Sequence, residues 1–139
     1  MRLFPSLAFT LAALLMAGAA HASDPAEGEW LTTGGKGRVQ ISPCTNFPSR
    51  LCGKILWIYK NHTDAHNPDP RLRARAIVGI QFLSNFHNEG PGRWTGGTIY
   101  DPESGKTYNS LMSIRPSNVL EVKGCVLMFC QTQTWTRAR

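Results

Sequence analysis

The chain has 139 residues and a formal net charge of +6. This length is enough for one domain with one hydrophobic core and too short for two. The basic residues are scattered, apart from Arg71, Arg73 and Arg75, and no basic run interleaves with aromatic residues. This distribution disfavours nucleic-acid binding and supports at most a weak preference for anionic surfaces or ligands.

The first 22 residues have the pattern of a cleaved signal peptide. Arg2 gives a short positive start, an almost wholly apolar stretch follows, and Ala20-His21-Ala22 fits the small-x-small rule for signal peptidase. The alternative is a membrane anchor, but the apolar stretch is only about 18 residues long and no stop-transfer charges follow it. We therefore expect a single domain at 23–139, periplasmic or secreted, without a membrane span and with a net charge reduced from +6 to +5 by loss of Arg2.

Four cysteines in a chain of this kind indicate disulfides, because exported proteins fold in an oxidising compartment. Three pairings are possible for Cys44, Cys52, Cys125 and Cys130. We favour the two local bridges, 44–52 and 125–130, each closing a loop of hairpin length. A metal site or redox pair is the alternative, but neither spacing is that of a CxxC motif.

The rest of the chain alternates polar and apolar residues between turn signals, which indicates β-strands. The clearest hairpin spans 92–108, where the turn Asp101-Pro102-Glu103-Ser104-Gly105 separates two β-rich runs. Within it, Gly96-Gly97 suggests a bulge or a close backbone approach. The other predicted strands are 29–33, 38–41, 51–59, 77–86, 119–124 and 129–137.

Eight short strands with hairpin connections predict an all-β fold. We prefer a small antiparallel up-and-down barrel to a sandwich, because consecutive hairpins pair neighbours and closure removes the sheet edges. The only long connection is 60–75, and a single short helical turn is expected at 72–76. In the last strand, Gln131, Gln133, Trp135 and Arg137 share one face.

Several motifs occur in a specific order along the chain. They are Cys44 with Leu51-Cys52-Gly53-Lys54-Ile55, Asp64 with Asn67-Pro68-Asp69 and Arg73, Trp94-Thr95-Gly96-Gly97-Thr98-Ile99-Tyr100-Asp101-Pro102, Gly105-Lys106-Thr107-Tyr108, Gly124-Cys125 and the run from Cys130 to Arg137. This order resembles the bacterial domain-of-unknown-function family 2147, over essentially all of 23–139. The resemblance implies a secreted or periplasmic protein with a lipocalin-like barrel, and it implies no activity because the family has none established.

Two further residues are similar to a pair found in lipocalins. Gly28-Glu29-Trp30 resembles the G-x-W that opens lipocalin barrels, and Arg137 lies on the last strand, where lipocalins place an arginine over that tryptophan. The resemblance implies that Trp30 and Arg137 close the barrel by a cation–π contact, which is a structural role. The chain is shorter than a typical lipocalin and lacks its usual middle motif, so ligand binding does not follow from this pair.

The loop 61–69 contains the residues considered for a metal site. His62 and His66 with Asp64 and Asp69 could supply nitrogen and oxygen ligands to a divalent cation. Prolines in the same loop disfavour the helix that would align the two histidines, and Asp64, Asn67 and Asp69 are typical turn-capping residues. Turn chemistry is the preferred interpretation, and no metal or cofactor is assigned.

Aromatic and basic residues supply the ligand-site candidates. Inward aromatics of a small barrel either fill the core or line a cavity, and three arginines at alternate positions could bind a carboxylate or phosphate. Core packing and a solvated surface paired with Asp64 and Asp69 are the structural alternatives. The candidate ligand-binding residues are Trp57, Trp94, Tyr100, Tyr108, Arg71 and Arg73.

Enzyme chemistry has little support, because the sequence has no nucleophile elbow, phosphate loop or zinc-protease motif. The leading hypothesis is a non-enzymatic exported barrel that binds a small apolar or amphipathic ligand. The alternatives are an envelope structural or interaction protein with a filled barrel, and divalent-metal binding at 61–69. Oligomeric state carries no sequence signal.

Overall fold

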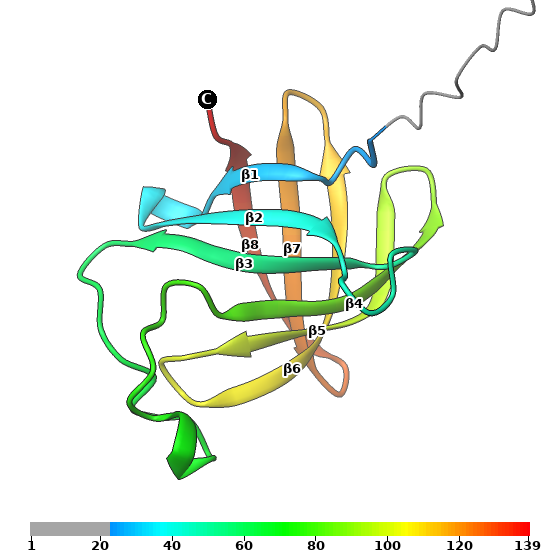
Figure 1. The fold of residues 1–139 in the computed structure, drawn as a ribbon. Coiled ribbons are helices and arrows are strands. Elements are labelled where there is room, and N and C mark those ends of the chain that lie inside the picture. The colour runs from blue at the N-terminus through cyan, green and yellow to red at the C-terminus, as the bar shows by residue number, and fades with distance from the viewer. Residues whose placement is uncertain (1–22) are drawn as a thin grey trace, which may run out of the picture.

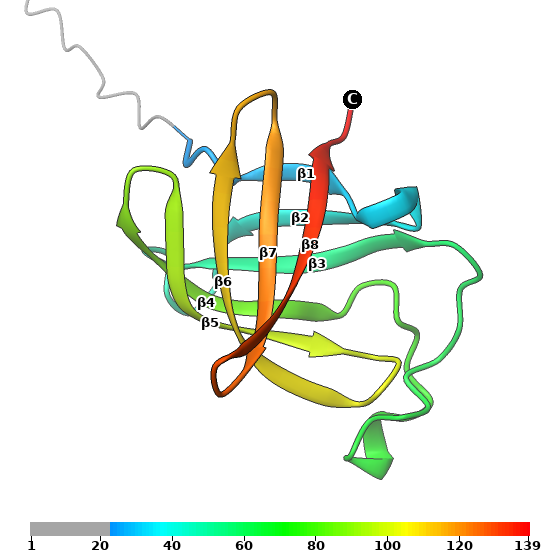
Figure 2. The same ribbon diagram turned by 180° about the vertical axis from the view of Figure 1, so that it is seen from behind.

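The structure, a computed structural model, describes residues 23–139, so the expected signal peptide at 1–22 lies outside the described residues. Within 23–139, eight antiparallel strands pair in sequence order and close into a barrel (Figures 1 and 2). The predicted up-and-down barrel is confirmed. The strands are β1 (Gly28–Leu31), β2 (Gly37–Pro43), β3 (Leu51–Ile58), β4 (Gln81–Gly90), β5 (Arg93–Asp101), β6 (Lys106–Arg115), β7 (Val119–Val126) and β8 (Phe129–Arg137).

One end of the barrel is closed by the segment just before β1. Ala26 in this segment is fully buried, and its carbonyl accepts a hydrogen bond from Trp30 Nε1 at 2.9 Å. Asp24 Oδ2 accepts another from Trp94 Nε1 of β5 at 3.0 Å. The Arg137 guanidinium lies 4.0 Å from the centre of the Trp30 ring and donates to the carbonyls of Glu27 and Pro25. We call this the closed end.

The interior next to the closed end is filled by large apolar side chains. Trp30, Trp94 and Trp135 are each at most 1% exposed, and Phe86 and Leu83 are fully buried between them and the remaining core. Phe82 packs on Trp135 with ring centroids 6.0 Å apart. This part of the barrel is therefore a packed core.

Strand β5 contains the bulge that its glycine pair suggested. The register against β6 shifts between Trp94 and Gly97, and Gly96 has a positive φ of 69°. A Cβ on Gly97 would lie 2.5 Å from the Phe86 ring, so this position admits only hydrogen. Because the bulge adds one residue, Trp94 and Ile99 both face the core although five positions separate them.

The local disulfide pairing favoured by the sequence is present. Cys44 is bonded to Cys52 and Cys125 to Cys130, and residues 23–139 contain no free cysteine. The first bridge ties the β2–β3 loop and the second the β7–β8 hairpin. Closing loops this short stabilises the fold by about 2–3 kcal/mol each.

The connection between β3 and β4 differs from expectation. The strand predicted to begin at Ile77 begins at Gln81, because Gly79 takes a positive φ of 97° that interrupts the extended chain. Ile77 and Ile80 remain buried as loop residues. The helical turn lies at Pro70–Leu72, whereas 72–76 was expected. The Asp69 carboxylate caps this turn, and Pro70 is its first residue.

Residues 23–139 contain a second single-turn 3₁₀ helix, Thr33–Gly35, between β1 and β2, one more helical turn than expected. No helix in this part of the chain is long and apolar enough to cross a membrane.

Arg137→Ala should lower the free energy of unfolding by about 2–3 kcal/mol, since it removes a cation–π contact and two hydrogen bonds to backbone carbonyls. Urea unfolding of the disulfide-intact protein measures this. Arg139→Ala, an exposed arginine two residues further on, is the matched control and should change stability by less than about 0.5 kcal/mol. Equal effects of the two substitutions would contradict the closing role of Arg137.

Candidate functional site

The half of β8 farthest from the closed end has a sheet partner on one side only. β8 pairs with β7 along its whole length, but with β1 only at Thr136 and Arg137. β1 is four residues long and ends at Leu31, where the chain turns into the 3₁₀ helix. The residues 129–134 are all exposed. We call this end of the barrel the open half.

The uncovered backbone groups of β8 belong to its even-numbered residues. The Ala138 N–H donates to the Glu29 carbonyl of β1, and the Arg137 N–H donates to the Asn118 carbonyl beside β7. The backbone groups of alternate residues in β8 therefore point towards opposite neighbouring strands. By this alternation the amides of Cys130, Thr132 and Thr134 face the side that β1 leaves empty. The Thr134 carbonyl there accepts a hydrogen bond from Thr33 Oγ1 at 3.1 Å.

Interior-facing side chains of the open half are solvent-exposed. Directly paired residues share a face of the sheet, so Gln133 lies on the same face as its buried partner Val122. Trp135 Nε1 donates to Gln133 Oε1 at 2.9 Å, which places that amide beside the core. Gln131, two residues away on the same face, is exposed as well. Two amides thus face the interior with access to solvent.

An apolar row continues from the core to the rim on this face. Ile99 of β5 pairs with Tyr108 of β6, and the register places Tyr108 opposite Val126 of β7, which pairs with Phe129 of β8. Exposure rises along the row, from 9% at Ile99 to 55% at Val126 and 80% at Phe129. Tyr108 is half-buried against the core. The open half therefore presents an apolar, partly aromatic surface with amide groups at its edge.

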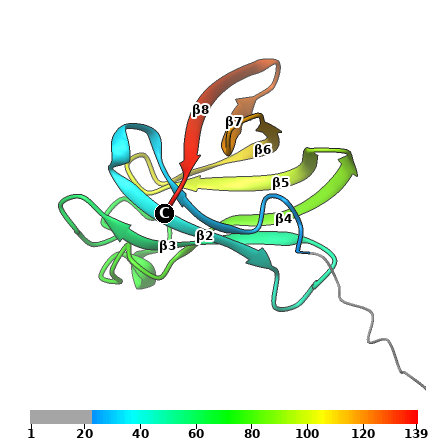
Figure 3. The same cartoon turned by 90° about the horizontal axis from the view of Figure 1, so that it is seen from above.

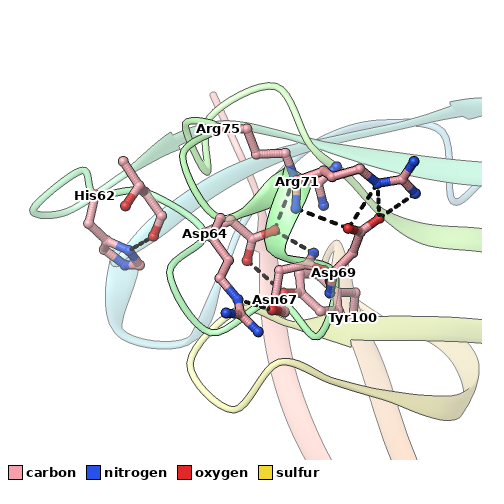
Figure 4. A network of polar contacts seen from close by, with 9 residues as sticks. His62, Asp64, Asn67, Asp69, Arg71, Arg75 and Tyr100 are labelled. Atoms are coloured by element: carbon pink, nitrogen blue, oxygen red, sulfur yellow. Dashed lines mark hydrogen bonds and ion pairs between the residues drawn. The ribbon is translucent and has the colours of Figure 1, made fainter.

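The long β3–β4 loop is held to the barrel by a buried carboxylate, Asp64 (Figure 4). Asp64 is fully buried and accepts hydrogen bonds from the Tyr100 hydroxyl at 2.6 Å, Asn67 Nδ2 at 2.8 Å and Arg75 Nε at 3.0 Å. Tyr100 belongs to β5, so the contact ties the loop to the sheet. Gly105, with a positive φ of 72°, lies so close to the His66 carbonyl that any Cβ there would clash with it.

The electrostatics of this network follow from its burial. Burial alone would raise the pKa of Asp64, but the hydrogen bonds from Tyr100, Asn67 and Arg75 and the charge of Arg75 outweigh it and lower that pKa below its ordinary 3.8. Burial, followed by the hydrogen bond and charge of Asp64, raises the pKa of Tyr100 from 10.0 to about 12. The network is stable with Asp64 ionised and Tyr100 neutral.

The surface of residues 23–139 is hollowed at places outside the open half. One concavity of about 510 Å³ lies beside the β4–β5 turn and is lined by Pro91, Trp94, Leu111 and Ile114 among others. A smaller one of about 190 Å³ lies between β2 and β3 and is lined by Gln40, Lys54 and neighbouring residues. Both concavities are open to solvent, and neither is an enclosed interior cavity.

Comparison with known proteins gives a family for the chain. Residues 28–137 match the model of the family DUF2147, described as an uncharacterized protein conserved in bacteria. The chain belongs to this family. The match spans the barrel from the first residue of β1 to the last of β8.

A solved structure supports the fold of this DUF2147 member. Protein HP1028 from the human pathogen Helicobacter pylori, described as belonging to the lipocalin family, is 24% identical, with a TM-score of 0.72 over 81% of this chain and 82% of its own. At this identity the likeness shows the lipocalin-like fold. A comparison with curated proteins finds no match.

The ligand-site candidates from the sequence lie in separate places in this DUF2147 barrel. Tyr108 lies on the apolar row, Trp94 is in the core and reaches the larger concavity, and Trp57 is 47% exposed on β3. Tyr100 and Arg73 both belong to the loop network, Arg73 through Nε to the Asn67 carbonyl. Arg71 is exposed and paired with Asp69 at 2.9 Å.

The sequence predicts no binding role for Val126 or Phe129, and it places Gln131 and Gln133 on one face of the last strand without a binding role. The signal for the two glutamines was present in the alternation of β8, which places them on the face of Trp135. Their exposure follows from the length of β1, which no local pattern in β8 reveals.

The candidate metal loop is organised by internal hydrogen bonds. Asp64 is surrounded by Tyr100, Asn67 and Arg75, Asp69 caps the 3₁₀ turn, and His62 Nδ1 lies 2.9 Å from the Thr63 carbonyl. Among residues 23–139 no group of three or more His, Cys, Asp or Glu side chains is arranged to hold a metal ion.

Tyr100→Phe should lower the free energy of unfolding by about 2 kcal/mol at pH 7, since it removes a hydrogen bond to a buried carboxylate. Because the pKa of Tyr100 is raised in the folded state, its contribution is complete below pH 10 and is lost as the pH rises towards 12. Urea unfolding should therefore show the difference between wild type and variant shrinking between pH 10 and 12. Tyr59→Phe, at a tyrosine that is 61% exposed, is the control and should change little. A difference that grows across this range would contradict the assignment.

Proposed function

We propose that this protein is a non-enzymatic extracytoplasmic binding protein that takes a small apolar or amphipathic ligand at the open half of its barrel. The observation that carries the proposal is the inward-facing row from Ile99 through Tyr108 and Val126 to Phe129, which leads from the core to solvent. Apolar surface of this kind gains free energy when a ligand removes it from water, at about 25 cal/mol per Å².

The polar groups beside the row suit an amphipathic molecule. Gln131 and Gln133 offer amide donors and acceptors next to the aromatic side chains, and such a combination fixes the orientation of an otherwise apolar ligand. The open half carries no buried charge on this face among the described residues, so a strongly charged ligand has no partner there. We infer that the polar end of the ligand is neutral or remains in solvent.

The packed interior sets the depth of the site. Trp30, Trp94 and Trp135 fill the barrel towards the closed end, so a ligand rests on the core instead of crossing it. Of the sequence-derived candidates, Tyr108 is proposed as a direct contact, whereas Trp94, Trp57, Tyr100, Arg71 and Arg73 would act, if they bind ligand, at other surfaces.

Export is part of the proposal. The signal-peptide pattern of residues 1–22 and the two disulfides support an extracytoplasmic location, because such bridges persist in oxidising compartments. The periplasm or the medium is the compartment that this pattern favours in a bacterium.

A second candidate function is an envelope interaction protein whose barrel serves only as a scaffold. The filled interior favours it, since three buried tryptophans leave the outer surface and loops as the remaining places for a partner. This candidate predicts no small-molecule binding at Tyr108 or Phe129.

Titration with the neutral, apolar fluorescent probe N-phenyl-1-naphthylamine tests the site. Tyr108→Ala and Phe129→Ala should each weaken binding about tenfold, the effect of losing about 1.4 kcal/mol of ring contact. Phe47→Ala, which removes an exposed aromatic ring from the other disulfide-closed loop, is the matched control and should leave binding unchanged.

Two results would contradict the proposal. A loss of binding in Leu111→Ala with none in Tyr108→Ala would move the site to the concavity beside the β4–β5 turn. Absence of probe binding, together with no co-purifying small molecule in native mass spectra of protein taken from its own export compartment, would favour the scaffold.

A further inference from the structure

The β7–β8 hairpin ends in four consecutive exposed apolar residues, 126–129, which we call the apolar tip. Val126 is 55% exposed, Leu127 and Met128 91% each, and Phe129 80%. The Cys125–Cys130 disulfide bridges the hairpin immediately behind them. Seen from above, this hairpin extends away from the strands β1 to β5 (Figure 3).

The fold itself does not account for this composition. Hairpin turns are ordinarily made of Gly, Asn, Asp and Ser, which tolerate a positive φ and water. Here Leu127 occupies the turn with a φ of 54°, a conformation that large side chains rarely adopt. Leu127 and Met128 are almost wholly exposed, so they contribute little to the core of the barrel. A strained turn that is closed by a disulfide and carries exposed apolar side chains indicates an intermolecular contact.

We propose that the apolar tip inserts into the interfacial region of a lipid bilayer that contains anionic lipids. The tip is a convex projection, which penetrates a deformable surface without a preformed complementary pocket. The disulfide holds the turn rigid, so little conformational entropy is lost on insertion.

The dimensions and polarity of the hairpin fit such a surface. The pair Val126–Phe129 lies two residues, or about 7 Å of strand, beyond the pair Gly124–Gln131. This length matches the depth of about 5–10 Å to which interfacial segments are buried at the boundary between headgroups and acyl chains. Gln131 and Thr132 begin the polar zone, and Lys123 lies opposite Thr132, at the depth of the headgroups.

Charge favours an anionic bilayer over a neutral one. Next to the apolar tip, residues 122–134 contain Lys123 and no acidic residue, and residues 23–139 as a whole carry a net charge of +5. Each basic residue near an anionic surface adds roughly 1 kcal/mol of attraction. Val126 and Phe129 belong both to the apolar tip and to the row that would contact a ligand, whereas Leu127 and Met128 lie beyond that row and allow the two roles to be tested separately.

Vesicle sedimentation tests the proposal with the barrel, residues 23–139, which contains all eight strands and both disulfides. The vesicles are phosphatidylethanolamine and phosphatidylglycerol at a ratio of three to one, with phosphatidylcholine vesicles for comparison. The barrel should bind the anionic vesicles, and the double variant Leu127→Ser/Met128→Ser should bind at least tenfold more weakly. Phe47→Ser, at an exposed apolar residue of the other stapled loop, is the matched control and should bind as wild type does.

The outcomes separate this inference from the proposed function. The double variant should keep wild-type affinity for the fluorescent probe, because its substitutions leave Tyr108 and Phe129 in place. Equal vesicle binding by wild type and double variant, or none by wild type, overturns the inference. Self-association of wild type that the double variant abolishes, without vesicle binding, assigns the apolar tip to a second copy of the chain and overturns it as well.

Discussion

The short contact between β1 and β8 is the constraint on which the rest of this barrel depends. β1 has four residues, and only Trp30 and Leu31 pair with β8. At that contact the barrel is closed, packed and anchored. Beyond it, the six exposed residues 129–134 of β8 and the interior face that they carry remain in contact with solvent. The same limited pairing therefore produces a rigid end and an accessible end.

The closed end concentrates the stabilising interactions. The segment 24–27 contributes a buried Ala26, a carboxylate for Trp94 and two carbonyls for Arg137. Arg137 in turn covers the ring of Trp30, so the first and last strands are joined by side chains where few backbone pairs are available. The residues that follow the expected cleavage site are thus structural parts of the barrel. The β3–β4 loop is anchored separately, through Asp64, to β5.

Much of the fold could be predicted from the sequence because its signals are local. Alternation and turn residues gave the hairpins, the compartment implied disulfides, and Gly96-Gly97 marked the bulge. The predicted start of β4 was wrong. Ile77 and Ile80 are β-branched, as strand residues often are, but they are buried in a loop that turns at Gly79. One of the hydrogen bonds to the Asp64 carboxylate comes from the hydroxyl of Tyr100, thirty-six positions away, and no local sequence pattern connects the two residues.

The open half was the least predictable part. Phe129 and Val126 look like ordinary strand residues, and their exposure depends on where β1 ends on the other side of the barrel. The exposure of the apolar tip could not be predicted for a related reason. Four apolar residues between two cysteines, Val126-Leu127-Met128-Phe129, have the composition of a buried turn. A sequence records the apolar character of such residues but not the absence of a neighbouring strand to cover them.

Amide hydrogen exchange along β8, resolved by residue, tests the central claim most directly. If β1 covers only the end of β8, the amides of Cys130 and Thr132 should exchange rapidly, while those of Gln131 and Gln133, which face β7, and of Thr136 and Ala138, which face β1, should be protected. Uniform protection of all these amides from 130 to 138 would show that β8 is covered along its whole length, and would contradict the open half and the site built on it.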